Sequence, residues 1–161
     1  TPPGPTPPGP TPPGPTPPGP VTVVGNLTQV NVLLQVSGFD SQNPRVIDPG
    51  DGFFVIAQLL NGSASTATGV TTSAVASTSS FVLVPNPGEV VNYGNVPAGG
   101  FAQNSIQSNN LGVLNTAPVG TTFFIDFNVT SDGQTRRFRS GPFVVGQSGN
   151  ATPIMAATPI N

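Results

Sequence analysis

The sequence contains no cysteine, no histidine and no tryptophan, and its four basic residues are all arginine. Without cysteine there is neither a disulfide framework nor thiolate chemistry. Without histidine, cysteine or lysine there is also no conventional catalytic triad, no Schiff base and no zinc site of the common kinds. We therefore expect a protein that is not an enzyme and that needs no cofactor.

Charge is also scarce, because charged residues make up 6% of the chain and the formal net charge is −2. Ordinary soluble domains carry about 25% charged residues. So neutral a surface needs another source of solubility, such as hydroxyl and amide side chains, attached glycans or burial against neighbours in an assembly. The negative balance argues against nucleic acid and anionic membranes as partners. No apolar run approaches the ~18 residues of a membrane span, so we expect no membrane insertion.

The first twenty residues repeat the unit TPPGP four times. Glycine recurs at every fifth position, which excludes collagen because the triple helix needs glycine at every third position. The prolines instead predict a polyproline II stalk over residues 1–20, about 60 Å long at roughly 3.1 Å per residue.

Polyproline II has about three residues per turn, so successive units are rotated by about 240° and their threonines spiral around the stalk. All-round display favours a coat of sugars on the hydroxyl groups, and an undecorated linker is an equal alternative. The candidates for O-glycosylation or proline hydroxylation are Thr1, Thr6, Thr11, Thr16, Pro2, Pro3, Pro7, Pro8, Pro12, Pro13, Pro17 and Pro18.

After residue 20 the sequence predicts β-strands. In the stretch 27–36 the apolar residues at 30, 32, 34 and 36 alternate with Gln29, Asn31, Leu33 and Gln35, which is the pattern of a half-buried strand. Further strands are predicted within 53–60, 80–85, 89–96 and 101–107, separated by Gly, Pro and Asn turns. The Ser- and Thr-rich segment 63–80 is interpreted as a polar edge strand or a loop, with an O-glycan acceptor as the less favoured alternative.

The most specific local prediction is a hairpin over residues 121–145, closed by Asp132-Gly133. This turn places Thr130 opposite Thr135, Phe127 opposite Phe138, and Asp126 opposite Arg139. One face then carries Phe123, Ile125, Phe127 and Val129, and the other carries Asp126, Asn128, Thr130, Arg137 and Arg139. Turn chemistry, aromatic pairing and charge pairing agree on one register. Arg136, beside Val129, is the one residue that does not fit.

No stretch shows sustained helical periodicity with caps, and short strands recur at roughly ten-residue intervals. The expected fold class is therefore all-β, with a single Ig-like antiparallel β-sandwich over residues 21–161 preceded by the polyproline II segment.

Four Asn-X-Ser/Thr sequons mark candidate N-glycosylation sites at Asn26, Asn61, Asn128 and Asn150. Asn61 falls in a predicted turn and Asn128 on the outer face of the predicted hairpin, whereas Pro153 follows the last sequon and makes it a poor acceptor. Asp40, Asp48 and Asp51 could supply oxygen ligands to Ca²⁺. Turn formation is the favoured role of the "DPGDG" stretch, so no metal site is predicted.

Two stretches, "NYGNVPAGGF" (92–101) and "TTFFIDFNVTSDGQTRRFRSGPF" (121–143), resemble the later strands of Ig-like domains on bacterial and archaeal cell surfaces. The resemblance covers about a third of the chain, and it implies an Ig-like β-sandwich.

The organisation of the chain, an extended N-terminal arm joined to a β-domain, also resembles subunits of donor-strand pili, in which one subunit completes the sheet of the next. The resemblance implies that residues 21–36 are donated. The assembly candidates on this strand are Val30, Val32, Leu34 and Val36. The C-terminal stretch 151–161, with Ile154, Met155 and Ile160, is a rival donor, and the alternative is that 27–36 belongs to its own domain. The absence of cysteine departs from chaperone-assembled pilins.

These features predict a structural subunit of an extracellular, glycosylated filament on a cell surface. Its expected partners are identical subunits in a helical or linear homopolymer, together with covalent glycans. The alternative is a monomeric adhesion or carbohydrate-binding module on a Pro-rich linker.

Overall fold

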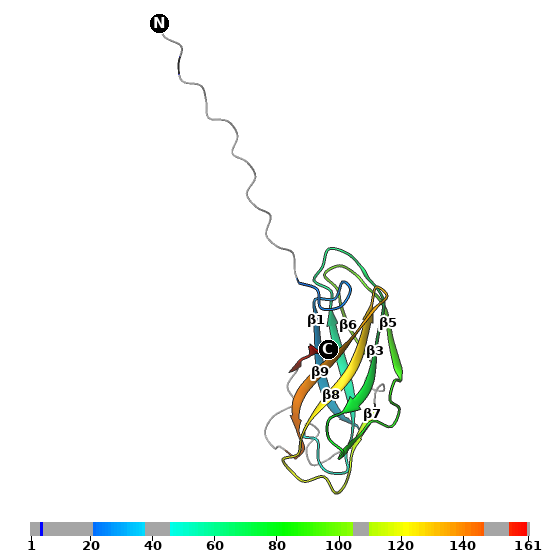
Figure 1. The fold of residues 1–161 in the computed structure, drawn as a ribbon, viewed down its shortest axis with the longest axis vertical. Helices are drawn as coiled ribbons and strands as arrows, with labels where there is room; N and C mark the ends of the chain where they lie inside the picture. The colour runs from blue at the N-terminus through cyan, green and yellow to red at the C-terminus, as the bar shows by residue number, and fades with distance from the viewer. Residues whose placement is uncertain (1–3, 5–20, 38–45, 105–109, 147–154, 161) are drawn as a thin grey trace.

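The computed structural model describes residue 4 and residues 21–37, 46–104, 110–146 and 155–160, so the stalk prediction lies outside the described residues apart from residue 4. The described part contains no helix, and its strands form two antiparallel sheets (Figure 1). The all-β class predicted from the sequence is confirmed.

The first sheet has the strand order β10-β1-β2-β7-β4, and β6 also pairs with β2. Its strands are β1 (Gln29–Ser37), β2 (Gly52–Leu60), β4 (Val82–Leu83), β6 (Phe101–Gln103), β7 (Asn110–Val113) and β10 (Met155–Ala156). The predicted strands within 27–36, 53–60, 80–85 and 101–107 correspond to β1, β2, β4 and β6. The predictions had placed no strand at β7.

The second sheet has the order β11-β9-β8-β3-β5. Its strands are β3 (Ala67–Ser77), β5 (Val90–Val96), β8 (Thr122–Ser131), β9 (Gln134–Val144) and β11 (Thr158–Ile160). The edge-strand or loop interpretation of 63–80 was wrong in its position, because β3 is an interior strand between β8 and β5. The sequence pattern did not indicate an interior strand, because a polar residue lies on the core face of β3. Val70 and Thr72 are both buried, and the hydroxyl of Thr72 hydrogen-bonds Tyr93.

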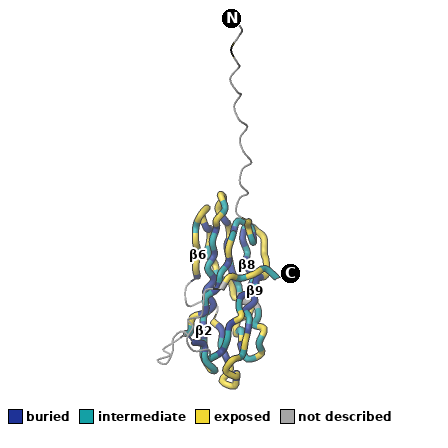
Figure 2. The backbone as a smooth tube through the Cα atoms, turned by 90° about the vertical axis from the view of Figure 1, so that its left-hand side faces the viewer, coloured by how far each residue is buried: buried dark blue, intermediate teal, exposed yellow. Residues whose placement is uncertain are grey.

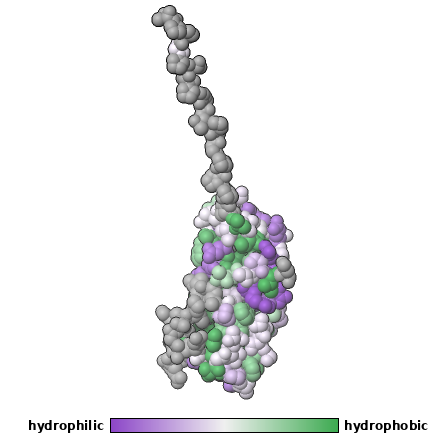
Figure 3. Space-filling model, turned by 60° about the vertical axis from the view of Figure 1, so that its left-hand side comes forward, coloured by the Kyte–Doolittle hydropathy of each residue, from purple (hydrophilic) through white to green (hydrophobic). Residues whose placement is uncertain are grey.

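The two sheets pack their apolar faces against each other, so that buried residues lie between the layers and exposed residues outside (Figure 2). Phenylalanine dominates the contact: the ring of Phe123 lies 5.9 Å from that of Phe53 and 5.6 Å from that of Phe143, measured between centroids. Phe127 stacks on Phe138 at 6.0 Å. Offset aromatic pairs at such distances add to the free energy gained by burial. On the face that Figure 3 shows, the described residues are largely pale in hydropathy, with separate hydrophilic and apolar areas.

The β8–β9 hairpin has the predicted register, with Thr130 opposite Thr135, Phe127 opposite Phe138, and Asp126 opposite Arg139. Its inner face buries Phe123, Ile125, Phe127 and Val129, as predicted. On the outer face Arg139 Nε lies 2.7 Å from Asp126 Oδ1, and Arg137 reaches the other carboxylate oxygen at 3.1 Å.

These hydrogen bonds, that from Arg139 foremost, hold the pKa of Asp126 below its usual range although burial raises it. Arg136 also has a role, because its guanidinium donates to the carbonyl of Val23 at 3.1 Å.

We predict that Phe123→Ala lowers the free energy of unfolding by about 3–5 kcal/mol, because the side chain is fully buried between Phe53 and Phe143. The matched control is Phe101→Ala, because Phe101 is 60% exposed. Its truncation should cost less than about 1 kcal/mol. Urea unfolding of both variants measures the difference. Equal losses would contradict the assignment of Phe123 to the core.

Candidate functional site: the two edges of the domain

The edge of the domain formed by β1 and β9 is closed by the C-terminal segment, defined as Met155–Ile160. Its first part, β10, pairs with β1, and its last part, β11, pairs with β9, so one short segment joins both sheets. Between the two strands, the Ala157 N–H donates to the carbonyl of Val30 at 2.8 Å. None of the described side chains from Ala156 to Ile160 is buried. The segment therefore caps an edge, and its described side chains from Ala156 to Ile160 are not fully buried there.

The predicted donor strand has a different position. The structure places Val30, Val32 and Leu34 in β1 with exposures of 2%, 0% and 2%, and Val36 packs beside the core. β1 pairs with β2 of the same chain along its whole length, from Gln29 to Ser37. Removing β1 would expose three core side chains, each worth about 1.5–3 kcal/mol. Donation of β1 stays a prediction, and the C-terminal segment is the less costly segment to detach.

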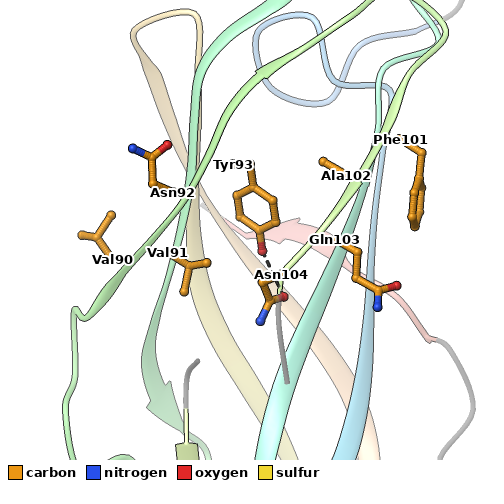
Figure 4. Close-up of a pocket in the computed structure, with 8 residues that line it drawn as sticks. All are labelled: Val90, Val91, Asn92, Tyr93, Phe101, Ala102, Gln103 and Asn104. Carbon is orange, nitrogen blue, oxygen red and sulfur yellow. Dashed lines mark hydrogen bonds between the residues drawn. The ribbon is translucent and has the colours of Figure 1, made fainter. Parts of the chain in front are cut away.

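The opposite edge is open and carries a groove between β5 and β6 (Figure 4). The two strands belong to different sheets and are joined by a turn in which the Gly100 N–H donates to the carbonyl of Pro97. The groove has a volume of about 650 Å³. It is lined by Val90, Val91, Asn92, Tyr93, Phe101, Ala102, Gln103 and Asn104. None of these side chains carries a charge.

The floor of this groove is a hydrogen-bonded pair. Tyr93 points between the strands, and its hydroxyl donates to Asn104 Oδ1 at 3.1 Å (Figure 4). Thr72 lies 3.2 Å from the same hydroxyl. Burial raises the pKa of Tyr93 to about 12, although the hydrogen bond with Thr72 lowers it in part. The phenol therefore stays neutral in water at any physiological pH.

Asn104 also fills a gap in the first sheet. β6 pairs with residues 58–60 of β2, and β7 pairs with residues 52–54. In between, Asn104 Oδ1 accepts from the Ala57 N–H at 2.6 Å, and its Nδ2 donates to the carbonyl of Val55 at 3.2 Å. The side-chain amide thus takes the place of a backbone partner, whose loss would otherwise leave buried polar groups unpaired.

A third feature is the stalk junction, defined as Val23–Leu27 and the β8–β9 turn. Val24 and Leu27 are buried, so the chain after residue 20 is anchored in the core. Gly25 lies so close to Ser131 and Asp132 that a Cβ atom there would clash with both. The Asp132 carboxylate accepts hydrogen bonds from the backbone of Asn26 at 2.7 Å and of Thr68 at 2.9 Å.

The candidate N-glycosylation sites differ in accessibility. Asn61 has no exposed surface; its amide donates to the carbonyls of Ser65 and Val96 and accepts from Ser63. This burial argues against the prediction for Asn61, because its nitrogen is used twice inside the fold. The sequence indicated a turn at this position, and the Asn61 side chain is itself part of the local structure because it hydrogen-bonds Ser63 and Ser65. Asn26 and Asn128 are half-buried, and Asn150 lies outside the described residues.

The acidic residues of the "DPGDG" stretch form a turn. Asp51 accepts from the Asp48 N–H at 2.8 Å and returns a backbone hydrogen bond at 3.1 Å, which is the geometry of a turn. Asp40 lies outside the described residues. Among the residues that the structure describes, no three of His, Cys, Asp and Glu gather into a group that could hold a metal ion. In the same residues, no helix has the length and apolar character to cross a membrane.

Comparison with protein-family models, with curated proteins and with solved structures finds no match to this chain.

The groove residues were not singled out as a site from the sequence. In β5, Val91 and Tyr93 are two residues apart with Asn92 between them, and that spacing could have indicated an inward-facing tyrosine. No sequence signal could have found Asn104, because its role depends on the gap between β6 and β7.

We predict that stability falls on acidification between about pH 4 and pH 2, in part through Asp132. Burial raises the pKa of Asp132, but hydrogen bonds from Ser131, Thr68 and Asn26 outweigh it and lower the pKa from 3.8 to about 2. The charged Asp132 carboxylate therefore stabilises the fold fully at pH values above 3.8, the ordinary pKa. This contribution is lost as the pH falls towards the lowered pKa of about 2.

The variant Asp132→Asn tests this directly, because the residue has a left-handed φ of 53°. Asparagine tolerates that conformation as well as aspartate does. We expect a loss of roughly 1 kcal/mol at pH 7, since solvent screens the half-buried carboxylate in part, and a weaker acid dependence in urea unfolding. Glu89→Gln, at an exposed residue, is the control and should follow the wild-type profile. An unchanged profile in Asp132→Asn would contradict the role of this carboxylate.

Proposed function

We propose that the protein is a structural subunit of an extracellular, glycosylated filament and that its domains are joined head to tail by strand exchange. The observation that carries the proposal is the C-terminal segment, which closes one domain edge by adding a short strand to each sheet. A terminal segment that completes a sheet edge can do so in its own domain or in a neighbouring one, because the contacts are the same in both.

The strand order supports an Ig-like sandwich as the unit of assembly. One sheet contains the order β1-β2-β7 and the other β9-β8-β3-β5. These orders correspond to A-B-E and G-F-C-C′ of immunoglobulin domains. Strand exchange between such sandwiches is heterologous, so it propagates into a linear polymer and does not close into a dimer.

The energetics favour the C-terminal segment over β1 as the exchanged element. The segment pairs with β1 only at Asn31 and Val32, and with β9 only along β11. Its described side chains are only partly buried or exposed. Its release leaves the phenylalanine core intact, whereas release of β1 opens the core.

The stalk junction supports a role in display. Val24 and Leu27 fix the chain that follows residue 20 in the core, Asp132 accepts a hydrogen bond from the backbone of Asn26, and Arg136 donates to the carbonyl of Val23. A polyproline II rod on such a base would carry its threonines away from the filament surface. Glycans on those hydroxyls would supply the solubility that a chain with 6% charged residues lacks.

We predict that Ala157→Pro abolishes filaments while it leaves the domain folded. Proline removes the N–H that bonds the carbonyl of Val30, so the segment can no longer close a sheet edge. The matched control is Ala98→Pro, in the exposed Pro97–Gly100 turn. Proline is compatible with the second position of such a turn.

Electron microscopy with helical reconstruction and size-exclusion chromatography check this prediction. The wild-type protein and Ala98→Pro should form filaments with residues 155–160 in the neighbouring subunit, and Ala157→Pro should elute near 16.2 kDa plus its sugar. Filaments that survive in Ala157→Pro, or residues 155–160 paired within their own subunit in the reconstruction, would contradict exchange through this segment.

We further predict that the native protein carries N-glycans at Asn26 or Asn128 and none at Asn61. The amide of Asn61 is buried and donates two hydrogen bonds inside the fold, whereas the other two asparagines retain exposed surface. Glycopeptide mass spectrometry measures the occupancy of each sequon. A glycan on Asn61 would show that the Asn61 turn is not formed as described.

A further inference from the structure

The groove between β5 and β6 has no role in the proposed strand exchange, yet it has the properties of a binding site. Two of its apolar residues are strongly exposed, Phe101 at 60% and Val90 at 64%. Tyr93 forms an aromatic floor that Asn104 holds in place (Figure 4). The site is therefore an uncharged, aromatic groove that the described part of its own chain leaves open.

The polar side chains of the groove present hydrogen-bond donors. The Oδ1 atom of Asn92 accepts from the Gly94 N–H at 2.8 Å, so its Nδ2 group is left as a donor. The Oε1 atom of Gln103 accepts from Gln58 Nε2 at 2.8 Å, so its own Nε2 is left as a donor as well. Two donors beside exposed apolar surface suit a ligand that is apolar and rich in acceptors.

A proline-rich chain is such a ligand, because proline has a carbonyl acceptor but no N–H donor. Aromatic grooves recognise segments of this kind in the polyproline II conformation. We propose that the groove between β5 and β6 binds a polyproline II segment and that its occupant is the TPPGP repeat of a second copy of this chain.

The repeat has the spacing that this site needs. Polyproline II brings residues i and i+3 to the same side, about 9 Å apart. In the repeat, Pro2, Pro5 and Pro8 stand in this phase, and so do the trios 7, 10, 13 and 12, 15, 18. In the polyproline II conformation each trio would form an apolar ridge on one side of the stalk, whereas each of the other two sides would include threonine and glycine. The proline ridge and the groove are both uncharged, so binding does not require the desolvation of a charged group.

Ordinary strand addition fits this edge less well. β5 carries Gly94 with a φ of 70°, and its register against β3 shifts at two positions. Such irregularities prevent a long regular ladder with an added strand. A polyproline II ligand needs no such ladder.

The position of the groove points to a second copy as the source of the repeat. The Pro97–Gly100 turn closes the groove at the end where Asn61 bonds the carbonyls of Val96 and Gly100, near Thr28 and the stalk junction. The predicted stalk would join the domain at that same end, because the chain enters there at residue 21, and a stiff rod would then have to reverse its direction to enter its own groove. Binding of the repeat to the groove goes beyond the proposed strand exchange, because it involves the TPPGP repeat and the β5 edge instead of the C-terminal segment and the β1 and β9 edge.

The test titrates ¹⁵N-labelled full-length chain carrying Ala157→Pro, which does not polymerise under the proposed function, with a synthetic peptide of four TPPGP units and follows the amide signals by NMR. We expect saturable shifts at Tyr93, Phe101 and Gln103. Phe101→Ser should weaken binding about tenfold or more, and Val90→Ser provides a second exposed groove variant. The control is Val119→Ser, because Val119 is 70% exposed and outside the groove. A peptide with the unit TPPGA breaks the proline trios and should bind at least tenfold more weakly.

Shifts outside the groove, equal weakening by Val119→Ser, or equal binding of the TPPGA peptide would overturn the inference. So would an oligosaccharide that shifts the groove signals when the peptide does not. The outcome is separable from the proposed function: peptide binding without filaments supports this inference alone, whereas filaments without peptide binding overturn it alone.

Discussion

The pairing of β8 with β9 through the Asp132-Gly133 turn is the constraint on which the rest of the structure depends. Both turn residues have left-handed φ values, 53° and 72°. Such turns twist in the sense that antiparallel strands require. The resulting register turns Phe127 and Phe138 inward and sets Asp126 against Arg139 on the outer face. The Asp132 carboxylate then receives the backbone N–H groups of the stalk junction and of β3. One turn thus orders the core, the ion pairs and the segment Val23–Leu27.

This hairpin could be predicted from the sequence because its turn, its aromatic pair and its charge pair lie close together along the chain and require one register. The position of β3, the burial of Asn61 and the role of Asn104 could not. Each depends on partners far along the chain, such as Val96 for Asn61 and Ala57 for Asn104. A polar residue is buried where distant groups complete its hydrogen bonds, and a single sequence does not display those groups. The strands β10 and β11 are too short to carry a periodic pattern.

A chain with few charges relies on neutral polar groups for tasks that ion pairs could otherwise perform. Of its buried polar residues in the described part, Asn61, Thr72, Asn104, Asp126, Ser131 and Ser140, one is charged. Asp126 is matched by two guanidinium groups, and the amides of Asn61 and Asn104 bind backbone groups directly. Burying a hydrogen-bonded amide costs far less than burying an ion, and its fixed donor and acceptor select one orientation. The amides of Asn61 and Asn104 thereby fix the arrangement of the groups around them without a buried charge.

The same scarcity of charge bears on assembly. Sheet edges are commonly protected from unwanted pairing by charged side chains, lysine above all, and this chain has no lysine. Its edges therefore rely on a covering segment or on irregular backbone. The C-terminal segment covers the β1 and β9 edge, while bulges and Gly94 distort the β5 edge and leave a groove there. Because the two edges differ, a contact between the same edge of two subunits is not favoured. A contact between different edges of two subunits is heterologous and can repeat in one direction. A composition poor in charge thus favours a domain that is completed by segments of chain, and the linear polymer proposed above is one assembly that such a domain can form.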